Sequence, residues 1–418
     1  MAYLQFQDYY RNLLLSGRLP MPYPNQSPYI HSSPNLSNEN CGDGGICREI
    51  GSWGPIANDY QYYAWHHQYN SYMEDECYDA PMPYQDPSTA LNFISINLVS
   101  NIPDCSRNID PNLLDPWGIV VIGDTIWITN SGSGLITRYN LLGIPLLPAI
   151  NIFGPFCNIA QPTGIVYNCN IFAFPLIKAN ISESASIIVA TRDGTINGYN
   201  GQIDSCSSAL LIDNSMNNSV YTGLELVNNI LYAVDFYNQC IDTYDGNLYK
   251  ITMGAFEDKC IEDPIPVDFA PYNIINIGDV LYVTYARQNP VDNQYEFLGP
   301  GHGYINIFTL DGIFIKRFAS RCCLNAPWGM AVSPSCFGYP AGSLLISNFG
   351  DNTINIFDPC GVYLGKMKDK SGIDLFIMGI RGLYVNTNHD RIVYWTSRGN
   401  NLKEAYIGSI NIGNMINT

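Results

Sequence analysis

The chain repeats one pattern of about 50 residues six times, and this repetition restricts the possible folds more than any other feature. Each repeat opens with a glycine, or once with an asparagine, beside a short run of β-branched and aromatic residues. The six positions are Gly118, Gly164, Gly223, Asn273, Gly329 and Gly382, which are 46, 59, 50, 56 and 53 residues apart. Repeats of this length are typical of the four-stranded blades of a β-propeller.

The residues inside each repeat predict four strands joined by tight turns. Segments rich in Ile, Val and Tyr alternate with Gly, Asn and Asp, and two-residue turns such as Gly123-Asp124 and Asn228-Asn229 separate the first two strands. A twisted four-stranded sheet cannot bury both of its faces alone, but six such sheets packed face to face around an axis can. We therefore predict an all-β fold, a six-bladed β-propeller.

The last repeat contains only three predicted strands, at residues 380–386, 391–397 and 405–412. The segment 92–99, NFISINLV, alternates apolar and polar residues, as a strand with one buried face does. We expect this N-terminal strand to close the last blade, so that both ends of the propeller share one sheet. Removing residues 92–99 should then cost far more stability than removing residues 1–85.

Residues 1–90 differ in composition from the rest, and we interpret them as an extended arm in front of a propeller at 91–418. They hold 12 of the 30 tyrosines and 9 prolines, and only a candidate amphipathic helix at residues 4–15 shows a regular hydrophobic period. Such a segment suits wrapping around a partner, because its large amphipathic side chains make contact at little ordering cost. The arm is expected to dock the propeller onto a protein partner or another copy, and the alternative is a disordered spacer.

Charge and hydropathy exclude several functions. The formal net charge is −17, with 37 acidic and 20 basic side chains, which would repel a nucleic-acid backbone. The sequence contains no run of 18 apolar residues, so it predicts no transmembrane helix. Its N-terminus lacks the basic start and the apolar run of a secretory signal peptide. The 13 cysteines include no CxxC pair and favour buried reduced thiols over a disulfide scaffold.

Propellers bind ligands at the mouth of the central channel, through loops and inner-strand ends of several blades. Residues at equivalent positions of the repeats are therefore candidates for a ligand site. They are the residues that follow the second predicted strand of five repeats and the tryptophans of two PWG turns: Asn130, Arg192, Asp235, Tyr285, Asn348, Trp117 and Trp328. Asn and Asp there also tie turns together, and Trp beside Gly also packs between blades, so a structural role is the favoured interpretation.

A metal-dependent hydrolase or lactonase would need carboxylates and amides that converge on the axis and hold calcium by oxygen ligands. Only Asp235, Asn130 and Asn348 could contribute, and one carboxylate makes a poor calcium site and no obvious general base. The repeats contain only two histidines, His302 and His389, in different parts of their units. Because no nucleotide-binding or nucleophile-elbow motif is present either, we expect no cofactor and no catalytic residue, with calcium as the alternative.

Three stretches near the start of the repeats read LVSN, DPNLLDPWG and WITNSGSG, at Leu98–Asn101, Asp110–Gly118 and Trp127–Gly134. This opening resembles that of a family of NHL-repeat-like propeller proteins, and NAPWG and SNFGD at 325–329 and 347–351 repeat parts of it. The resemblance covers about residues 95–412. It implies the propeller fold but no particular activity. Secreted members of that family carry signal peptides. This sequence shows no such signal, so the resemblance does not imply an extracellular location.

The high content of Ile, Asn and Tyr is similar to that of proteins from giant DNA viruses of the mimivirus type. This resemblance implies a virion component or a product of the viral factory in the host cytoplasm. We therefore expect a non-enzymatic binding or structural propeller, attached to a virion or another assembly through residues 1–90. The alternative is a calcium-dependent hydrolase or lactonase-like enzyme at the channel mouth, which stoichiometric calcium in the purified protein would favour.

Overall fold

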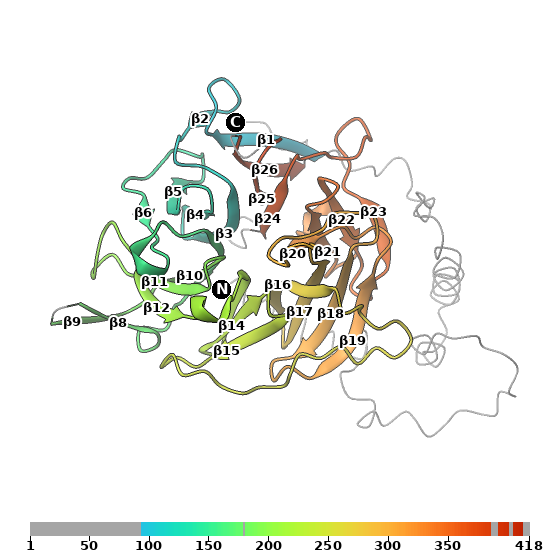
Figure 1. The fold of residues 1–418 in the computed structure, drawn as a ribbon. Helices are drawn as coiled ribbons and strands as arrows, with labels where there is room; N and C mark the ends of the chain where they lie inside the picture. The colour runs from blue at the N-terminus through green and yellow to red at the C-terminus, as the bar shows by residue number, and fades with distance from the viewer. Residues whose placement is uncertain (1–92, 179, 386–391, 401–403, 413–418) are drawn as a thin grey trace, which may run out of the picture.

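The computed structural model describes residues 93–178, 180–385, 392–400 and 404–412. In these residues six antiparallel sheets surround a central axis, as Figure 1 shows. The predicted six-bladed β-propeller is confirmed. The arm at residues 1–90, with its candidate helix at 4–15, lies outside the described residues.

We number the blades one to six by the chain order of their innermost strands. The first blade comprises β3 (Pro116–Ile122), β4 (Thr125–Asn130), β5 (Leu135–Asn140) and β6 (Ile150–Asn151), and the second β7 (Pro162–Tyr167), β10 (Ile187–Thr191), β11 (Thr195–Tyr199) and β12 (Ala209–Asp213). The third comprises β13 (Tyr221–Val227), β14 (Ile230–Asp235) and β15 (Cys240–Tyr244), and the fourth β16 (Phe269–Ile277), β17 (Val280–Arg287), β18 (Gly303–Thr309) and β19 (Phe314–Ser320).

The fifth blade comprises β20 (Pro327–Val332), β21 (Leu344–Asn348), β22 (Thr353–Phe357) and β23 (Tyr363–Lys366). The sixth comprises β24 (Ile380–Val385), β25 (Val393–Ser397), β26 (Tyr406–Ile412), β1 (Phe93–Ser100) and β2 (Asn108–Ile109). A separate hairpin, β8 (Pro175–Lys178) and β9 (Ile181–Ser184), projects from the rim of the second blade (Figure 1). The described residues also include three short 3₁₀ turns, η5 (Pro155–Cys157), η6 (Ser215–Asn217) and η7 (Ser335–Phe337).

The expected closure of the ring is confirmed. Strand β1 pairs antiparallel with β26, with Phe93 opposite Ile412 and Ser95 opposite Ile410. The indole N–H of Trp395 in β25 also donates to Ser95 Oγ at 3.1 Å. The first and last strands of the propeller therefore share the sixth blade.

The third blade departs from the expected four strands, because it has only three. Residues 249–268 take the place of the fourth strand, and they contain Pro264 and Pro266, which lack the N–H that a ladder needs. Arg317 of β19 fastens this segment to the fourth blade. Its side chain, 5% exposed, donates to both oxygens of Asp258 at 3.0 Å and to Asp263 at 3.1 Å.

The six repeat positions lie on the innermost strands, where neighbouring blades approach most closely. A Cβ atom at Gly118 would lie 2.5 Å from Thr163 O, and one at Gly382 would lie 2.5 Å from Trp117 O. Only glycine fits at such a distance, which explains the spacing in the sequence.

A ring of side-chain hydrogen bonds joins each blade to the innermost strand of the next blade. In every case a side chain of one blade donates to a main-chain carbonyl of the following blade. The six bonds run from Thr129 to Thr163 O, Thr163 to Tyr221 O, Thr222 to Tyr272 O, Asn273 to Trp328 O, Ser347 to Arg381 O and Thr396 to Trp117 O. The ring explains why the fourth repeat has asparagine where the others have glycine, since the Asn273 amide makes the bond that a hydroxyl makes elsewhere.

Within the described ranges, no helix has the length and apolar character needed to cross a membrane.

Candidate functional site

Aromatic side chains fill the axis of the propeller. The residue before the repeat position points inward in the first, fourth and fifth blades, and these residues are Trp117, Tyr272 and Trp328. The Trp117 ring lies 6.3 Å from Tyr272 and 5.6 Å from Trp328, centroid to centroid. The first and fourth blades stand opposite each other, so these contacts cross the axis. Trp328 Nε1 also donates to Thr222 O of the third blade at 3.0 Å.

Arginines and aromatic rings alternate at the mouth of the channel where the innermost strands begin. We call this group the arginine–aromatic stack, and its members in order are Arg398, Phe349, Arg381, Trp117, Arg192 and Tyr295. The distances from each guanidinium carbon to the adjacent ring centroids are 4.6, 4.5, 3.6, 5.9 and 4.0 Å along the stack. Guanidinium groups are attracted to the faces of aromatic rings, and Trp is the best acceptor. The stack joins the first, second, fourth, fifth and sixth blades.

The loop between β17 and β18, residues 288–302, crosses from the fourth blade toward the second. Gln288 Nε2 donates to Phe236 O of the third blade at 2.6 Å. Arg192 of the second blade donates through Nη2 to Gln294 O at 2.9 Å and stacks on Tyr295. This loop therefore covers part of the mouth, and Arg192 holds it there.

Arg381 is buried without a hydrogen bond from its side chain to any described residue. It is 2% exposed, and Nε and Nη1 have no partner. Nη2 lies 3.8 Å from Asp115 Oδ1, which is an ion-pair distance but too long for a hydrogen bond. A buried charge with unpaired donors is costly, so this guanidinium is the least satisfied group of the stack.

Two groups beside Arg381 are also unsatisfied. Asp115 Oδ2 accepts the indole N–H of Trp117 at 3.3 Å, but its Oδ1 receives no hydrogen bond from the described residues. The hydroxyl of Tyr272 makes no hydrogen bond of ordinary geometry to a described residue, but it lies beside the carboxylate of Glu296. Burial first, and then the negative charge of Glu296, raise the pKa of the Tyr272 phenol well above its usual value. The hydroxyl therefore stays protonated and remains a donor.

Positive charge is concentrated at this mouth. Burial, and then the charge of Arg381, lower the pKa of Arg398, while Asp115 and Glu296 oppose this effect. Three arginines thus meet at one place in a chain whose net charge is −17, and the carboxyl groups of Asp115, Asp193 and Glu296 lie beside them. The site could hold an anion by charge, stacking and the free N–H groups of Arg381.

Three of the seven residues predicted from the sequence meet at this mouth, namely Trp117, Arg192 and Trp328. The other four, Asn130, Asp235, Asn348 and Tyr285, are at most 6% exposed and lie within their own blades. Tyr285 packs in the core of the fourth blade.

The three residues named for a metal each make hydrogen bonds within their own blade. Asn130 Nδ2 donates to Thr137 Oγ1 at 2.9 Å, Val220 N donates to Asp235 Oδ1 at 3.0 Å, and Asn325 N donates to Asn348 Oδ1 at 3.0 Å. They lie in the first, third and fifth blades. In the part of the chain with described coordinates, no three His, Cys, Asp or Glu side chains group closely enough to hold a metal ion. A calcium site at these residues stays a prediction.

Sequence reasoning missed Arg381, Tyr272, Phe349, Tyr295 and Arg398. A signal existed for the first two, because each directly precedes a repeat position, as Trp117 and Trp328 do. The other three come from loops, and nothing in the repeat pattern marks them.

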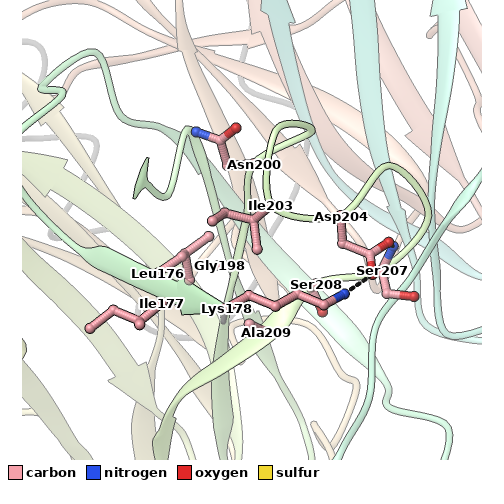
Figure 2. A pocket seen from close by; sticks show the side chains of 10 residues that line it. All are labelled: Leu176, Ile177, Lys178, Gly198, Asn200, Ile203, Asp204, Ser207, Ser208 and Ala209. Carbon is pink, nitrogen blue, oxygen red and sulfur yellow. Dashed lines mark hydrogen bonds and ion pairs between the residues drawn. The ribbon is translucent and has the colours of Figure 1, made fainter. Parts of the chain in front are cut away.

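A separate pocket of about 210 Å³ lies at the rim of the second blade, beside the β8–β9 hairpin (Figure 2). Leu176 and Ile203 line it, and Lys178 forms an ion pair with Asp204 at 2.7 Å across it. The lysine is mostly exposed, and such surface pairs contribute little. This pocket contains none of the predicted residues, so the channel mouth is the stronger candidate.

Comparison with known proteins identifies viral relatives. No protein-family model matches the sequence. Uncharacterized protein R640 of Acanthamoeba polyphaga mimivirus is 44% identical over 330 residues, which are 78% of this chain and 60% of that protein, so the chain spans less than two thirds of R640. Uncharacterized protein R648 of the same virus is 37% identical over 327 residues, 78% of this chain and 82% of R648.

Comparison with solved structures supports the fold but says nothing about the function. A structural genomics protein of unknown function from Bacteroides thetaiotaomicron aligns with a TM-score of 0.50 and 12% identity, over 77% of this chain and 76% of that chain.

Proposed function

Since the chain belongs to the family of mimivirus proteins that includes R640 and R648, we propose that it is a non-enzymatic binding propeller of the virus. Residues 1–90 attach it to the virion or to an assembly in the viral factory of the host cytoplasm. The channel mouth is its binding face. The observation that carries this proposal is the arginine–aromatic stack, which fills that mouth with groups suited to binding.

The chemistry of the mouth supports binding over catalysis. Arginine stays charged at neutral pH, and Phe and Trp rings carry no titratable group, so these side chains bind through fixed charge and stacking. General acid–base catalysis needs a group that titrates near the working pH. Each carboxyl group of the mouth lies beside an arginine: Asp115 and Glu296 interact with Arg398, Asp115 also pairs with Arg381, and Asp193 interacts with Arg192.

Attachment can be tested in infected amoebae. Tagged full-length chain and tagged 86–418 would be produced during mimivirus infection, and purified particles would be probed for the tag. The shorter chain keeps β1, so its propeller should still fold. We expect the full-length chain in the particles and loss of the shorter one. Equal recovery of the two chains in purified particles would contradict the role of residues 1–90 in attachment.

A fusion protein separates attachment from folding. Residues 1–90 fused to a fluorescent carrier should bring the carrier into particles, and the carrier alone should stay outside. A carrier that is excluded in both forms would contradict the arm as an attachment element.

Elemental analysis tests the non-enzymatic part of the proposal. The alternative raised by the sequence is a calcium-dependent hydrolase or lactonase-like enzyme, which would purify with about one calcium per chain. Purified full-length protein without stoichiometric calcium supports the binding propeller. One tightly held calcium, lost in an Asp235→Asn variant, would overturn it.

A further inference from the structure

We propose that the channel mouth binds a carboxylate, which the edge of the Arg381 guanidinium receives between Trp117 and Phe349. This inference rests on the proposed binding function and specifies the ligand. The unsatisfied state of Arg381 carries it: a guanidinium 2% exposed makes no side-chain hydrogen bond to the described residues. The N–H groups of a buried guanidinium are normally hydrogen-bonded, because a buried donor without an acceptor is costly.

The geometry around Arg381 selects an acceptor that approaches in the guanidinium plane. Trp117 covers one face at 3.6 Å and Phe349 lies at 4.5 Å, so only the N–H edges remain free. A carboxylate is planar and accepts two parallel N–H bonds from a guanidinium edge. Asp115 does not fill this place, since its Oδ1 stays 3.8 Å from Nη2.

The charges of the mouth favour a ligand with one negative charge over a ligand with two. Arg192, Arg381 and Arg398 lie there together with three carboxyl groups, because Asp115 and Glu296 interact with Arg398 and Asp193 interacts with Arg192. These carboxyl groups already offset the arginines, so each further negative charge is repelled, and a phosphate dianion is repelled more strongly than a carboxylate.

The loop 288–302 controls access to this place. Arg192 holds it through Gln294 O and the Tyr295 ring. A ligand that reaches Arg381 has to displace this loop or pass beside it. The entry side is therefore the face that carries the stack.

Thermal unfolding of the full chain tests the inference, with potassium acetate as the probe against potassium chloride at equal ionic strength. Acetate should raise Tm saturably, by roughly 2–5 °C, because it binds only the folded state. Arg381→Met should abolish the response. The unliganded Tm of that variant should be lower than that of the original chain, because Asp115 loses its ion-pair partner and Trp117 and Phe349 lose the stacked guanidinium.

Arg138→Met is the matched control. Arg138 also stacks on a tryptophan, Trp127 at 5.2 Å, but it lies on the third strand of the first blade, away from the mouth. Its acetate response should remain. If Arg381→Met does not fold, Arg398→Met should still raise the half-saturating acetate concentration several-fold.

Three outcomes would overturn the inference: no response of the original chain to acetate, an equal response of the folded Arg381→Met variant, or a response to phosphate alone. Comparing acetyl-glutamate-amide with acetyl-glycine then separates an acidic side chain from a chain end as the source. The particle test removes residues 1–85 and leaves the mouth intact, so failure here is distinguishable from failure of the proposed function.

Discussion

Thr396 of the sixth blade donates its hydroxyl to the carbonyl oxygen of Trp117 in the first blade at 2.6 Å and accepts the N–H of Gly382 at 2.8 Å. Thr396→Val keeps the side-chain shape but removes both bonds, leaving a buried carbonyl and a buried N–H unpaired. We expect a loss of about 1–3 kcal/mol in the free energy of unfolding, measured by urea denaturation. Thr252→Val, at an exposed position, is the control. Equal effects of the two variants would contradict a role for the ring.

The pairing of β1 with β26 predicts a sharp boundary for truncation. A chain starting at residue 86 should unfold at the same temperature as the full chain within about 2 °C, because it keeps Phe93–Ser100. A chain starting at residue 101 exposes the edge of β26 and should be unfolded or aggregated at 25 °C. Circular dichroism and size-exclusion chromatography distinguish these states. A soluble, cooperative chain 101–418 would show that the ring closes without β1.

Arg317 holds the segment that replaces the fourth strand of the third blade. Arg317→Met leaves the partly buried Asp258 without its ion-pair partner, while Asp263 keeps its ion pair with Arg321, and breaking a buried ion pair costs roughly 3–5 kcal/mol. We expect a lower midpoint in urea and faster tryptic cleavage after Lys259. Lys178→Met removes an exposed ion pair and should change stability by about 1 kcal/mol or less. Unchanged cleavage in Arg317→Met would mean that other contacts hold the segment.

Glu225 predicts a pH dependence of stability. Burial raises the pKa of this carboxyl to about 7, although the N–H groups of Asn276 and Leu226 donate to it and oppose the shift. A folded-state pKa above the unfolded value of about 4.3 means that the stabilisation is present below that pH and is lost as pH rises through about 7.

Glu225→Gln cannot ionise and should lack this loss. Between pH 5 and pH 8 the original chain should lose roughly 1–3 kcal/mol more unfolding free energy than the variant. The other carboxylates of the chain titrate in both proteins, so the difference between them is the measured quantity. Glu262→Gln, at an exposed position, should behave like the original chain. Parallel pH curves for Glu225→Gln and the original chain would rule out the raised pKa.

The six-bladed fold could be predicted from the sequence because the close approach of neighbouring backbones requires glycine at recurring positions. Gly118 and Gly382 recur at blade spacing, since a Cβ at either would collide with a carbonyl of the next blade. The alternation in NFISINLV likewise predicted the shared sixth blade. The missing fourth strand of the third blade escaped prediction because the spacing of Gly223 and Asn273 still fits a complete blade.

The channel mouth was only partly predictable for a different reason. Trp117 and Trp328 stood out because the PWG turn occurs twice, whereas Arg381 and Tyr272 take equivalent places with unlike side chains. Stacking across the axis depends on distant loops: Arg192 meets the main chain of Gln294, 102 residues away. No local pattern encodes such a contact, so it emerges only when the blades are assembled.

Because Trp117, Tyr272 and Trp328 meet on the axis, the central channel is closed at that level and opens only toward the mouth. A ligand that enters through the mouth and reaches Arg381 must also leave through the mouth. The opposite face of the propeller can therefore contact another surface without blocking entry of the ligand. On the proposed attachment to a particle, the orientation of the propeller on its support alone determines whether the ligand site is accessible.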